Sequence, residues 1–462
     1  MSMTPSPTSQ VDPRELANLL PQGTVLTDAD IIESYRFDQA RWQTAGVPLC
    51  VARPASADEV ETIVRWAARH RVPIVPRGAG SGLSGGAAAI DDGIVLSLER
   101  MKRIVTIDRD AMFAVVEPGV INGDLKAACK EFGLWYPPDP ASFTFSTMGG
   151  NVATNAGGLC CVKYGVTVDY VMGLEVVMAD GTRLRTGGRT RKNVAGYDLT
   201  RLFVGSEGTL GVVTEITVRL RRLAPAGTTM VATFDSLRAA GEAVANIVKT
   251  CDPSLLEIMD GASIRAVEAH QPMDLDTTAA AMLFTRSETR GGASDEPDRL
   301  RQACEVARAT SIYATEDEWE GEMFLQARRL AFPALEKLGS VLVDDVAVPI
   351  TRLTEMIGRV EDIAKRTETH VVTVGHAGDG NLHPLVIYDG RDAESERRAI
   401  AAFEAIMDEA IAIGGTITGE HGVGTLKKAF LHRQLGEASI ALHGRLKAAF
   451  DPLGIMNPGK VF

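Results

Sequence analysis

Apolar residues in the N-terminal half alternate between helical and strand-like spacing. Positions 60, 63, 64 and 67 are apolar, which predicts a helix over 58–70 with Ser56 as its N-cap. A second helix is expected over 122–132, capped by Asn122. Short apolar runs predict strands at 73–76, 94–98, 104–108, 114–116, 171–178 and 212–220. This half is therefore expected to be rich in short strands.

The second half changes character around Ala224-Pro-Ala-Gly227, a candidate domain boundary. Beyond it the patterns alternate in the manner of an α+β domain. Strands are expected at 230–234 and 280–285, helices at 236–250, 295–309 and 317–338, and a strand–helix unit at 254–270. Strands at 369–374 and 385–388 would enclose a tight turn at 378–381, and the chain ends in a helix-rich tail.

Three glycine-rich loops fall within the first half, at 77–86, 147–158 and 205–211. Glycine lets consecutive backbone N–H groups converge on an anion. Gly80-Ser-Gly-Leu-Ser-Gly85 matches a dinucleotide fingerprint, but the gap before the strand at 94 is too short for a Rossmann crossover helix. The loops instead predict a backbone wrapped around one long, flat, anionic ligand such as a dinucleotide.

Composition narrows the class of protein. A chain of 462 residues predicts two or three domains, and 45% hydrophobic with 23% charged residues is typical of a globular enzyme. The net charge of −12 argues against nucleic acid as the main partner. No apolar run reaches the ~20 residues of a membrane span. Six cysteines without a Cys-x-x-Cys pair suggest neither a disulfide scaffold nor an iron–sulfur cluster, so a reducing cytoplasm is expected.

Two short motifs concentrate the histidines. His376-Ala-Gly-Asp-Gly-Asn-Leu-His383 and Gly419-Glu-His-Gly422 each follow an apolar run that we expect to be a strand. His376 and His383 would flank one turn and face a common point. A single histidine in such a turn is more often only a polar turn residue, but two such motifs favour a functional site. Two imidazoles and a carboxylate suit a divalent metal, and a further histidine is a candidate base.

These residues resemble a known family. Residues 76–86, 147–158, 192–199 and 205–215 closely resemble the FAD-binding domain of the vanillyl-alcohol-oxidase-type (PCMH-type) flavoproteins. Residues 376–383, 419–422 and 455–460 resemble the FAD-linked D-2-hydroxy-acid dehydrogenases, which include D-lactate dehydrogenase, the glycolate oxidase D subunit and D-2-hydroxyglutarate dehydrogenase. The resemblance extends from about residue 35 to the C-terminus.

The resemblance implies an α+β fold in several parts. A lead-in (1–34) would precede a two-subdomain FAD-binding domain (35–224) and a ferredoxin-like α+β substrate domain (225–418), and a C-terminal segment (419–462) would return to the flavin. Some relatives attach FAD through a histidine in the first glycine-rich loop, where this chain has Ser81. Noncovalent FAD is therefore expected, although contact of Cys160 or Cys161 with the flavin is left open.

The expected FAD contacts follow from the same resemblance. They lie in or beside the three glycine-rich loops, in the loop before the second of these, at Tyr164, and in the C-terminal segment. They are Pro76, Arg77, Gly78, Ala79, Gly80, Ser81, Gly82, Leu83, Ser84, Gly85, Pro138, Asp139, Ser142, Thr147, Gly149, Gly150, Asn151, Ala153, Thr154, Asn155, Gly157, Gly158, Tyr164, Gly208, Gly211, Val213 and Asn457.

The resemblance also assigns chemistry. His376, His383 and Glu420 map onto metal ligands, with Zn²⁺ expected first and Fe²⁺ or Mn²⁺ as alternatives. His421 maps onto a base that takes the hydroxyl proton while hydride passes to flavin N5. Arg328, with Arg329 as the neighbouring alternative, is the expected carboxylate clamp, because its planar fork binds a carboxylate in two places.

The acid is expected to be small. Phe332 and Val343 fall where hydroxyglutarate enzymes carry polar residues for a second carboxylate, which favours D-lactate or glycolate over D-2-hydroxyglutarate. Two further hypotheses for the function are a metal-free FAD-dependent sugar or alcohol oxidase and a non-enzymatic metalloprotein. A quinone, an electron-transfer protein, O2 or a partner subunit would take the electrons. We expect a cytoplasmic protein, with peripheral attachment to the inner membrane face and homodimer formation as further possibilities.

Overall fold

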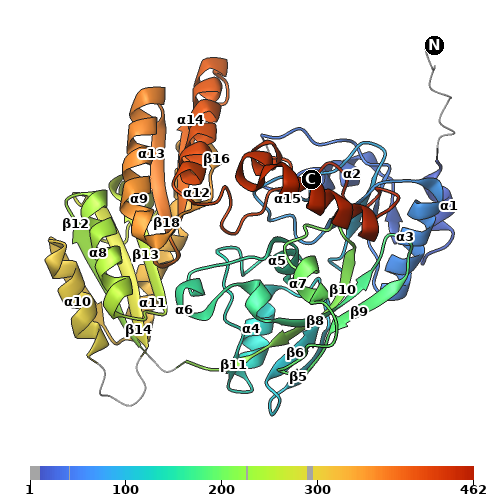
Figure 1. The fold of residues 1–462 in the computed structure, drawn as a ribbon, viewed down its shortest axis with the longest axis horizontal. Helices are drawn as coiled ribbons and strands as arrows, with labels where there is room; N and C mark the ends of the chain where they lie inside the picture. The colour runs from blue at the N-terminus through green and yellow to red at the C-terminus, as the bar shows by residue number, and fades with distance from the viewer. Residues whose placement is uncertain (1–10, 41, 225–226, 289–294) are drawn as a thin grey trace.

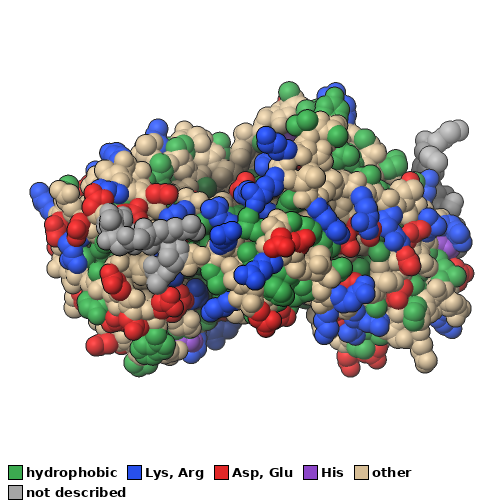
Figure 2. All heavy atoms as spheres, turned by 90° about the horizontal axis from the view of Figure 1, so that it is seen from below, with side chains coloured by type: hydrophobic (Ala, Val, Ile, Leu, Met, Phe, Trp, Pro, Cys, Tyr) green, Lys and Arg blue, Asp and Glu red, His purple; other side chains and the backbone are tan. Residues whose placement is uncertain are grey.

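The computed structural model describes residues 11–40, 42–224, 227–288 and 295–462 and forms two lobes (Figure 1). The first ten residues of the expected lead-in (1–34) lie outside the described residues. Seen from below, the lobes meet at a narrower waist where Lys and Arg side chains gather (Figure 2). In the described part of the chain, no helix combines the length and apolar character needed to cross a membrane.

The N-terminal lobe begins with a four-stranded sheet in the order β1-β2-β4-β3. Its strands are β1 (Val25–Leu26), β2 (Cys50–Ala52), β4 (Ile94–Ser97) and β3 (Ile74–Arg77), and the last three run parallel. Helix α3 (Ala57–His70) starts where predicted, with the Ser56 hydroxyl accepting the N–H of Glu59. The loop from β3 to β4 contains no helix, which confirms the exclusion of a Rossmann crossover.

The segment expected as a lead-in contributes to this lobe. It contains α1 (Pro13–Ala17), β1 and α2 (Ala29–Tyr35), and β1 pairs with β2. Leu16 is fully buried in the core beneath α3. The first sheet therefore starts before residue 35, because burying Leu16 and pairing β1 stabilise the segment.

A five-stranded antiparallel sheet completes the lobe, in the order β5-β6-β10-β8-β9. Its strands are β5 (Ile104–Asp108), β6 (Phe113–Val116), β10 (Val212–Arg219), β8 (Val171–Val177) and β9 (Arg183–Gly187). The remaining elements are α4 (Asn122–Lys130), β7 (Leu134–Trp135), α5 (Met148–Thr154), α6 (Cys161–Tyr164), a 3-10 turn η1 (Thr167–Asp169), α7 (Leu199–Phe203) and β11 (Arg221–Arg222). Helix α3 packs between the two sheets. The hydrophobic cluster that contains its buried residues also includes Ile74 and Ile94 from the first sheet and Val177 and Val212 from the second.

The predicted cap of α4 is wrong. The N-cap is Ile121, and no side chain caps the helix. Asn122 is buried, and its amide donates to Asn151 Oδ1 (3.0 Å) and to the carbonyl oxygen of Pro138 (3.2 Å). These tertiary partners replace the local cap and tie α4 to α5.

The C-terminal lobe is an antiparallel sheet with helices on both faces, ordered β15-β12-β14-β13-β18-β19-β16, with β17 beside β19. The strands are β12 (Gly227–Phe234), β13 (Leu255–Asp260), β14 (Ala281–Glu288), β15 (Ser311–Thr315), β16 (Ser340–Val343), β17 (Val346–Ala347), β18 (His370–His376) and β19 (Asn381–Tyr388). One face carries α8 (Leu237–Thr250), α10 (Glu296–Val306), α13 (Leu353–Thr367) and α14 (Ala393–Ala412). The other carries α9 (Gly261–His270), α11 (Glu318–Arg329) and α12 (Ala331–Leu335).

Two predictions for this lobe need correction. The helix expected over 317–338 is two helices that meet at Leu330, because Pro333 lacks the N–H that would continue the bond pattern of α11. The motif at 419–422 does not follow a strand: an isolated bridge between Ala347 and Thr416 is the only strand-like pairing there among the described residues.

The C-terminal segment ties the lobes together. Helix α15 (Lys428–Phe450) kinks at Gly436, where φ is 74°. Its start packs into the core of the C-terminal lobe through Phe430, whereas Met456 lies in the core of the N-terminal lobe. The N–H of Asn457 donates to the carbonyl of Ile74 at 2.7 Å, which returns the chain to β3.

Candidate functional site

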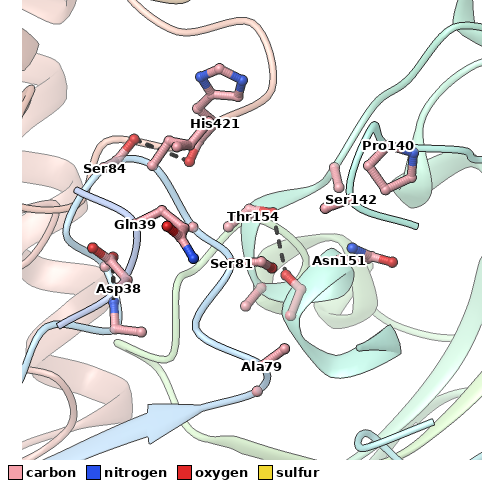
Figure 3. A pocket seen from close by; sticks show the side chains of 18 of the residues that line it. Asp38, Gln39, Ala79, Ser81, Ser84, Pro140, Ser142, Asn151, Thr154 and His421 are labelled. Atoms are coloured by element: carbon pink, nitrogen blue, oxygen red, sulfur yellow. Dashed lines mark hydrogen bonds between the residues drawn. The ribbon is translucent and has the colours of Figure 1, made fainter. Parts of the chain in front are cut away.

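A cavity of about 510 Å³ lies between the lobes and receives residues from both. The N-terminal lobe contributes the three glycine-rich loops. The C-terminal lobe contributes α11, α12, the β18–β19 hairpin and the loop that carries His421. Figure 3 shows the first loop, with Ala79, Ser81 and Ser84, running from the side of α5 to the His421 loop.

The structure places most of the predicted FAD contacts on the cavity wall. These are Pro76, Arg77, Gly78, Ala79, Gly80, Ser81, Gly82, Leu83, Ser84, Ser142, Thr147, Gly149, Gly150, Asn151, Ala153, Thr154, Gly208, Gly211 and Val213. The others lie off the wall: Gly85, Pro138, Asp139, Asn155, Gly157, Gly158, Tyr164 and Asn457.

Residues off the wall hold it in place. The Asn457 amide donates to the carbonyls of Gly86 and Glu207, and Asp139 accepts the N–H of Cys160 at 3.0 Å. Tyr164 donates to Glu288 of the other lobe. These residues therefore position the loops of the cavity.

The close approach of two loops explains the glycines. A Cβ on Gly78 would lie 2.2 Å from Thr147 Oγ1, and Gly80 has a φ of +70°. Thr147 also caps α5 by accepting the N–H of Gly150 at 3.2 Å. Small residues at these positions leave backbone exposed to the cavity, a surface that fits a dinucleotide.

The two adjacent cysteines do not reach the cavity wall. Cys160 Sγ lies 3.5 Å from Asp139 Oδ2, and burial raises the pKa of both the Cys160 and Cys161 thiols well above their usual value. At the wall, the first loop presents Ser81.

The hairpin brings the two predicted histidines together. His376 ends β18, His383 lies on β19, and their ring centroids are 5.1 Å apart. Glu420 Oε1 lies 3.1 Å from His376 Nε2, 3.3 Å from His383 Nε2 and 3.9 Å from His421 Nε2. Three imidazole nitrogens thus converge on one carboxylate oxygen, and two of them, from His376 and His383, were expected from the sequence to face a common point.

Asp345 shapes the loop that supplies Glu420 and His421. One oxygen of this fully buried carboxylate accepts the N–H groups of Gly419, Glu420 and His421 at 2.8–2.9 Å, and the Thr418 hydroxyl at 2.7 Å. Its other oxygen lies 3.5 Å from His383 Nδ1. Burial opposes ionisation, but the neighbouring basic side chains of His421, Lys427 and His383 hold the pKa of Asp345 below its usual range.

Protonation differs among the converging groups. Burial opposes charge on Glu420, yet the neighbouring His376 and His383 hold its pKa well below the usual value. His376 has a pKa well above its usual value, because Glu257 and Glu420 outweigh its burial. Burial lowers the pKa of His421 to about 4, which leaves this imidazole neutral at pH 7 and able to accept a proton.

The charge balance of the cluster fits a divalent cation. Its side chains comprise four carboxylates and two basic groups, namely Glu257, Asp344, Asp345, Glu420, Arg328 and Lys427, and all of them except Glu420 are buried. The ligand atoms of His376, His383 and Glu420 lie within 4.8 Å of one another. Unbalanced negative charge among convergent nitrogen and oxygen donors is a setting for Zn²⁺, Fe²⁺ or Mn²⁺.

The predicted carboxylate clamp is at the same cavity. Arg328 is buried on α11, and its Nε lies 3.0 Å from Glu257 Oε2. Arg329 also lines the cavity but pairs with Glu322 at 3.2 Å on the outer side. Phe332 and Val343, the residues expected to limit the acid's tail, both lie on the wall.

Glu257 and Asp345 were not predicted from the sequence. Glu257 lies inside the apolar strand Leu255-Leu-Glu-Ile-Met259, and Asp345 follows the strand 340–343. An acid within a buried strand is the signal that could have marked Glu257, because an unpaired buried charge is costly. Its partners Arg328 and His376 are distant in sequence.

The sequence is similar to known protein families and to individual proteins. Residues 48–187 match a model described as "FAD binding domain", and residues 223–461 match one described as "FAD linked oxidases, C-terminal domain". The chain is 42% identical over 431 residues to the glycolate oxidase subunit GlcD of Bacillus subtilis (strain 168), covering 93% of this chain and 92% of that protein. It is 34% identical over 438 residues to a D-lactate dehydrogenase of Archaeoglobus fulgidus, with 93% and 95% covered.

A solved structure shares the fold. The p-cresol methylhydroxylase structure with substrate bound superposes with a TM-score of 0.80 at 18% sequence identity, covering 97% of this chain and 95% of that one. This likeness supports a PCMH-type FAD-binding fold in an α+β protein. The matched models and the relative GlcD show that the chain belongs to the FAD-linked oxidases and is an FAD-dependent oxidoreductase.

Proposed function

We propose that the protein oxidises a small D-2-hydroxy acid, D-lactate or glycolate, to the corresponding 2-oxo acid. The observation that carries this proposal is the convergence of three imidazole Nε2 atoms on Glu420, in one cavity with the glycine-rich loops and Arg328. Relatives named as a glycolate oxidase subunit and as D-lactate dehydrogenase support the same substrate class.

Each side chain has a separate task. Arg328 binds the substrate carboxylate, and its buried position strengthens that ion pair. His421 accepts the hydroxyl proton at Nε2, for which its neutral state prepares it. FAD held by the glycine-rich loops supplies the acceptor, N5, for the hydride that leaves the substrate's Cα.

His376, His383 and Glu420 would hold the divalent metal. A metal there supplies a Lewis acid that lowers the pKa of the substrate hydroxyl. Zn²⁺ is our first choice for two imidazoles and one carboxylate, and Fe²⁺ or Mn²⁺ would suit the same ligands.

The walls near Arg328 favour a short tail. Phe332 and Val343 line the cavity and cannot pair with a second carboxylate. D-2-hydroxyglutarate is therefore the runner-up substrate.

Anaerobic mixing of the purified protein with a panel of 2-hydroxy acids tests this function. We expect D-lactate or glycolate to bleach the flavin absorbance faster than D-2-hydroxyglutarate and L-lactate do. Faster bleaching by D-2-hydroxyglutarate would overturn the substrate assignment, and no bleaching by any 2-hydroxy acid would overturn the function.

A separate acceptor would be needed to reoxidise the flavin. We propose a quinone, an electron-transfer protein or a partner subunit. Peripheral attachment to the inner membrane face and homodimer formation belong to the same proposal. Reoxidation assays with a soluble quinone, compared with assays in cell membranes, would separate these acceptors.

A further inference from the structure

Glu257 occupies an unusual place for a charged residue. It lies on β13, in the middle of the C-terminal lobe's sheet, and its side chain is 0% exposed. Leu256 and Ile258, its neighbours along the strand, pack into the core on one face of the sheet. Because side chains alternate along a strand, Glu257 faces the opposite side, toward the cavity.

The two oxygens of Glu257 have different partners. Oε1 lies 2.7 Å from His376 Nδ1, and Oε2 lies 3.0 Å from Arg328 Nε. A carboxylate can only accept, so His376 Nδ1–H donates to Glu257, which reserves Nε2, 3.1 Å from Glu420 Oε1, as the nitrogen that would bind a metal ion. The atom of Arg328 in this pair is Nε, so the fork formed by Nη1 and Nη2 is not used in it.

We infer that Glu257 is a positioning residue that couples the carboxylate clamp, Arg328, to the metal ligand His376. This inference rests on the proposed function. One rigid carboxylate sets the tautomer and direction of the imidazole and holds the guanidinium at a fixed distance from it. The separation between the groups for the substrate's carboxylate and for its hydroxyl thus depends on a single buried side chain.

A purely stabilising ion pair would behave differently. Breaking a buried pair costs folding stability wherever the pair lies. Coupling predicts in addition that a change at Arg328, which does not touch a metal ligand, alters metal affinity through Glu257. That effect should vanish when Glu257 cannot bridge.

The test measures metal affinity without turnover. Apo protein is titrated with Zn²⁺ against a chromophoric chelator, for wild type, Glu257→Gln, Arg328→Met and the double variant. The single carbonyl oxygen of a glutamine can accept from only one of the two donors, His376 Nδ1–H and Arg328 Nε–H. We therefore expect Glu257→Gln to weaken Zn²⁺ binding roughly 10–100-fold, the usual effect of removing a hydrogen-bond partner of a metal-bound histidine. Arg328→Met alone should weaken Zn²⁺ binding several-fold. The double variant should bind Zn²⁺ no more weakly than Glu257→Gln alone.

A matched control is available in the other lobe. Glu175 is a buried strand residue whose carboxylate pairs with Arg185 at 2.7 Å and accepts the Thr214 hydroxyl, and it does not line the cavity. Glu175→Gln should leave Zn²⁺ affinity unchanged. If Glu257→Gln does not fold, Glu257→Asp keeps the charge but is one methylene shorter, and it should show the same weakened binding.

The outcomes separate this inference from the proposed function. A folded, FAD-loaded Glu257→Gln or Glu257→Asp protein with wild-type Zn²⁺ affinity overturns the coupling. So does an Arg328→Met effect that persists undiminished in the double variant. A wild-type protein that binds no divalent metal overturns the proposed metal site itself.

Discussion

At the scale of single residues, the three histidines differ in the carboxylate that lies near their Nδ1 atom. His376 donates to Glu257, whereas His383 and His421 both turn Nδ1 toward Asp345, at 3.5 and 4.0 Å. The rings of His383 and His421 stack with their centroids 4.9 Å apart. His421 lies furthest from Glu420 Oε1, consistent with a role in proton transfer rather than metal binding.

Replacing His421 tests that role. We expect His421→Asn to slow flavin reduction by D-lactate roughly 10²–10⁴-fold, because a positioned general base is removed. FAD content should stay normal, since Ser84 contacts the backbone of His421 and not its ring. Anaerobic stopped-flow spectroscopy measures the rate, and His443→Asn, which alters a histidine stacked on Phe462, is the control. Reduction at the wild-type rate would contradict the assignment.

Two wall residues carry the prediction about substrate length. We expect the double variant Phe332→Thr, Val343→Lys to raise kcat/KM for D-2-hydroxyglutarate relative to D-lactate about tenfold or more, because a charge-assisted hydrogen bond contributes about 1.5–3 kcal/mol. Steady-state rates with both acids measure the ratio. An unchanged ratio would show that neither residue faces the acid's tail.

At the scale of elements, the loop from 418 to 424 is held from both lobes. Asp345 binds its first half, while Ser84 donates to the carbonyls of His421 and Gly422. Glu207 accepts the N–H groups of Val423 (2.7 Å) and Gly424 (2.9 Å). The backbone of this loop passes close to that of the first glycine-rich loop, because a Cβ on Gly424 would lie 1.9 Å from the Ser84 carbonyl oxygen.

Glu207 makes this attachment sensitive to pH. Burial raises its pKa to about 7, despite the two N–H donors. In the unfolded chain the pKa of this carboxyl is about 4.3. Between about pH 4.3 and pH 7 the folded protein therefore holds a proton that the unfolded chain has released. For this reason the free energy of unfolding falls as pH rises through this window. We expect Glu207→Gln, which cannot ionise, to gain stability relative to wild type from pH 5 to pH 7.5, by on the order of 1–3 kcal/mol. Thermal unfolding at both pH values measures the difference, and a constant difference would contradict it.

At the scale of the whole molecule, the site exists because two lobes and the returning C-terminal segment meet. The glycine-rich loops come from one lobe, the histidine hairpin from the other, and α15 leads back to β3. Lys460 donates to the carbonyls of Gly85 and Ala88, which fastens the last residues to the first loop. The glycine-rich loops and the proposed metal ligands therefore line one cavity.

Metal removal tests this arrangement as a whole. We expect dialysis against EDTA to lower the rate of flavin reduction at least tenfold while the flavin spectrum and FAD content persist, because the loops that hold FAD are separate from His376, His383 and Glu420. Restoring Zn²⁺, Fe²⁺ or Mn²⁺ in turn should recover the rate and identify the metal. Full activity in metal-free protein would favour a metal-free oxidase.

Local patterns were sufficient for much of this protein. The three glycine-rich loops, the hairpin that carries His376 and His383, and the helix after Ser56 could be predicted, since each depends on turn chemistry or on periodicity within a few residues. The motif containing Glu420 could also be recognised, because its glycines and charged residues stand together.

Tertiary structure decided the rest. Glu257 and Asp345 became part of the site, and Asn122 a bridge to α5 in place of a cap, through partners distant in the chain. Contacts to both lobes fix the shape of the 418–424 loop, and in the described part of the chain no strand directly precedes it to do so. The physical reason is that buried charges and amides take whichever partner the fold brings within hydrogen-bond distance, and sequence separation does not encode that proximity.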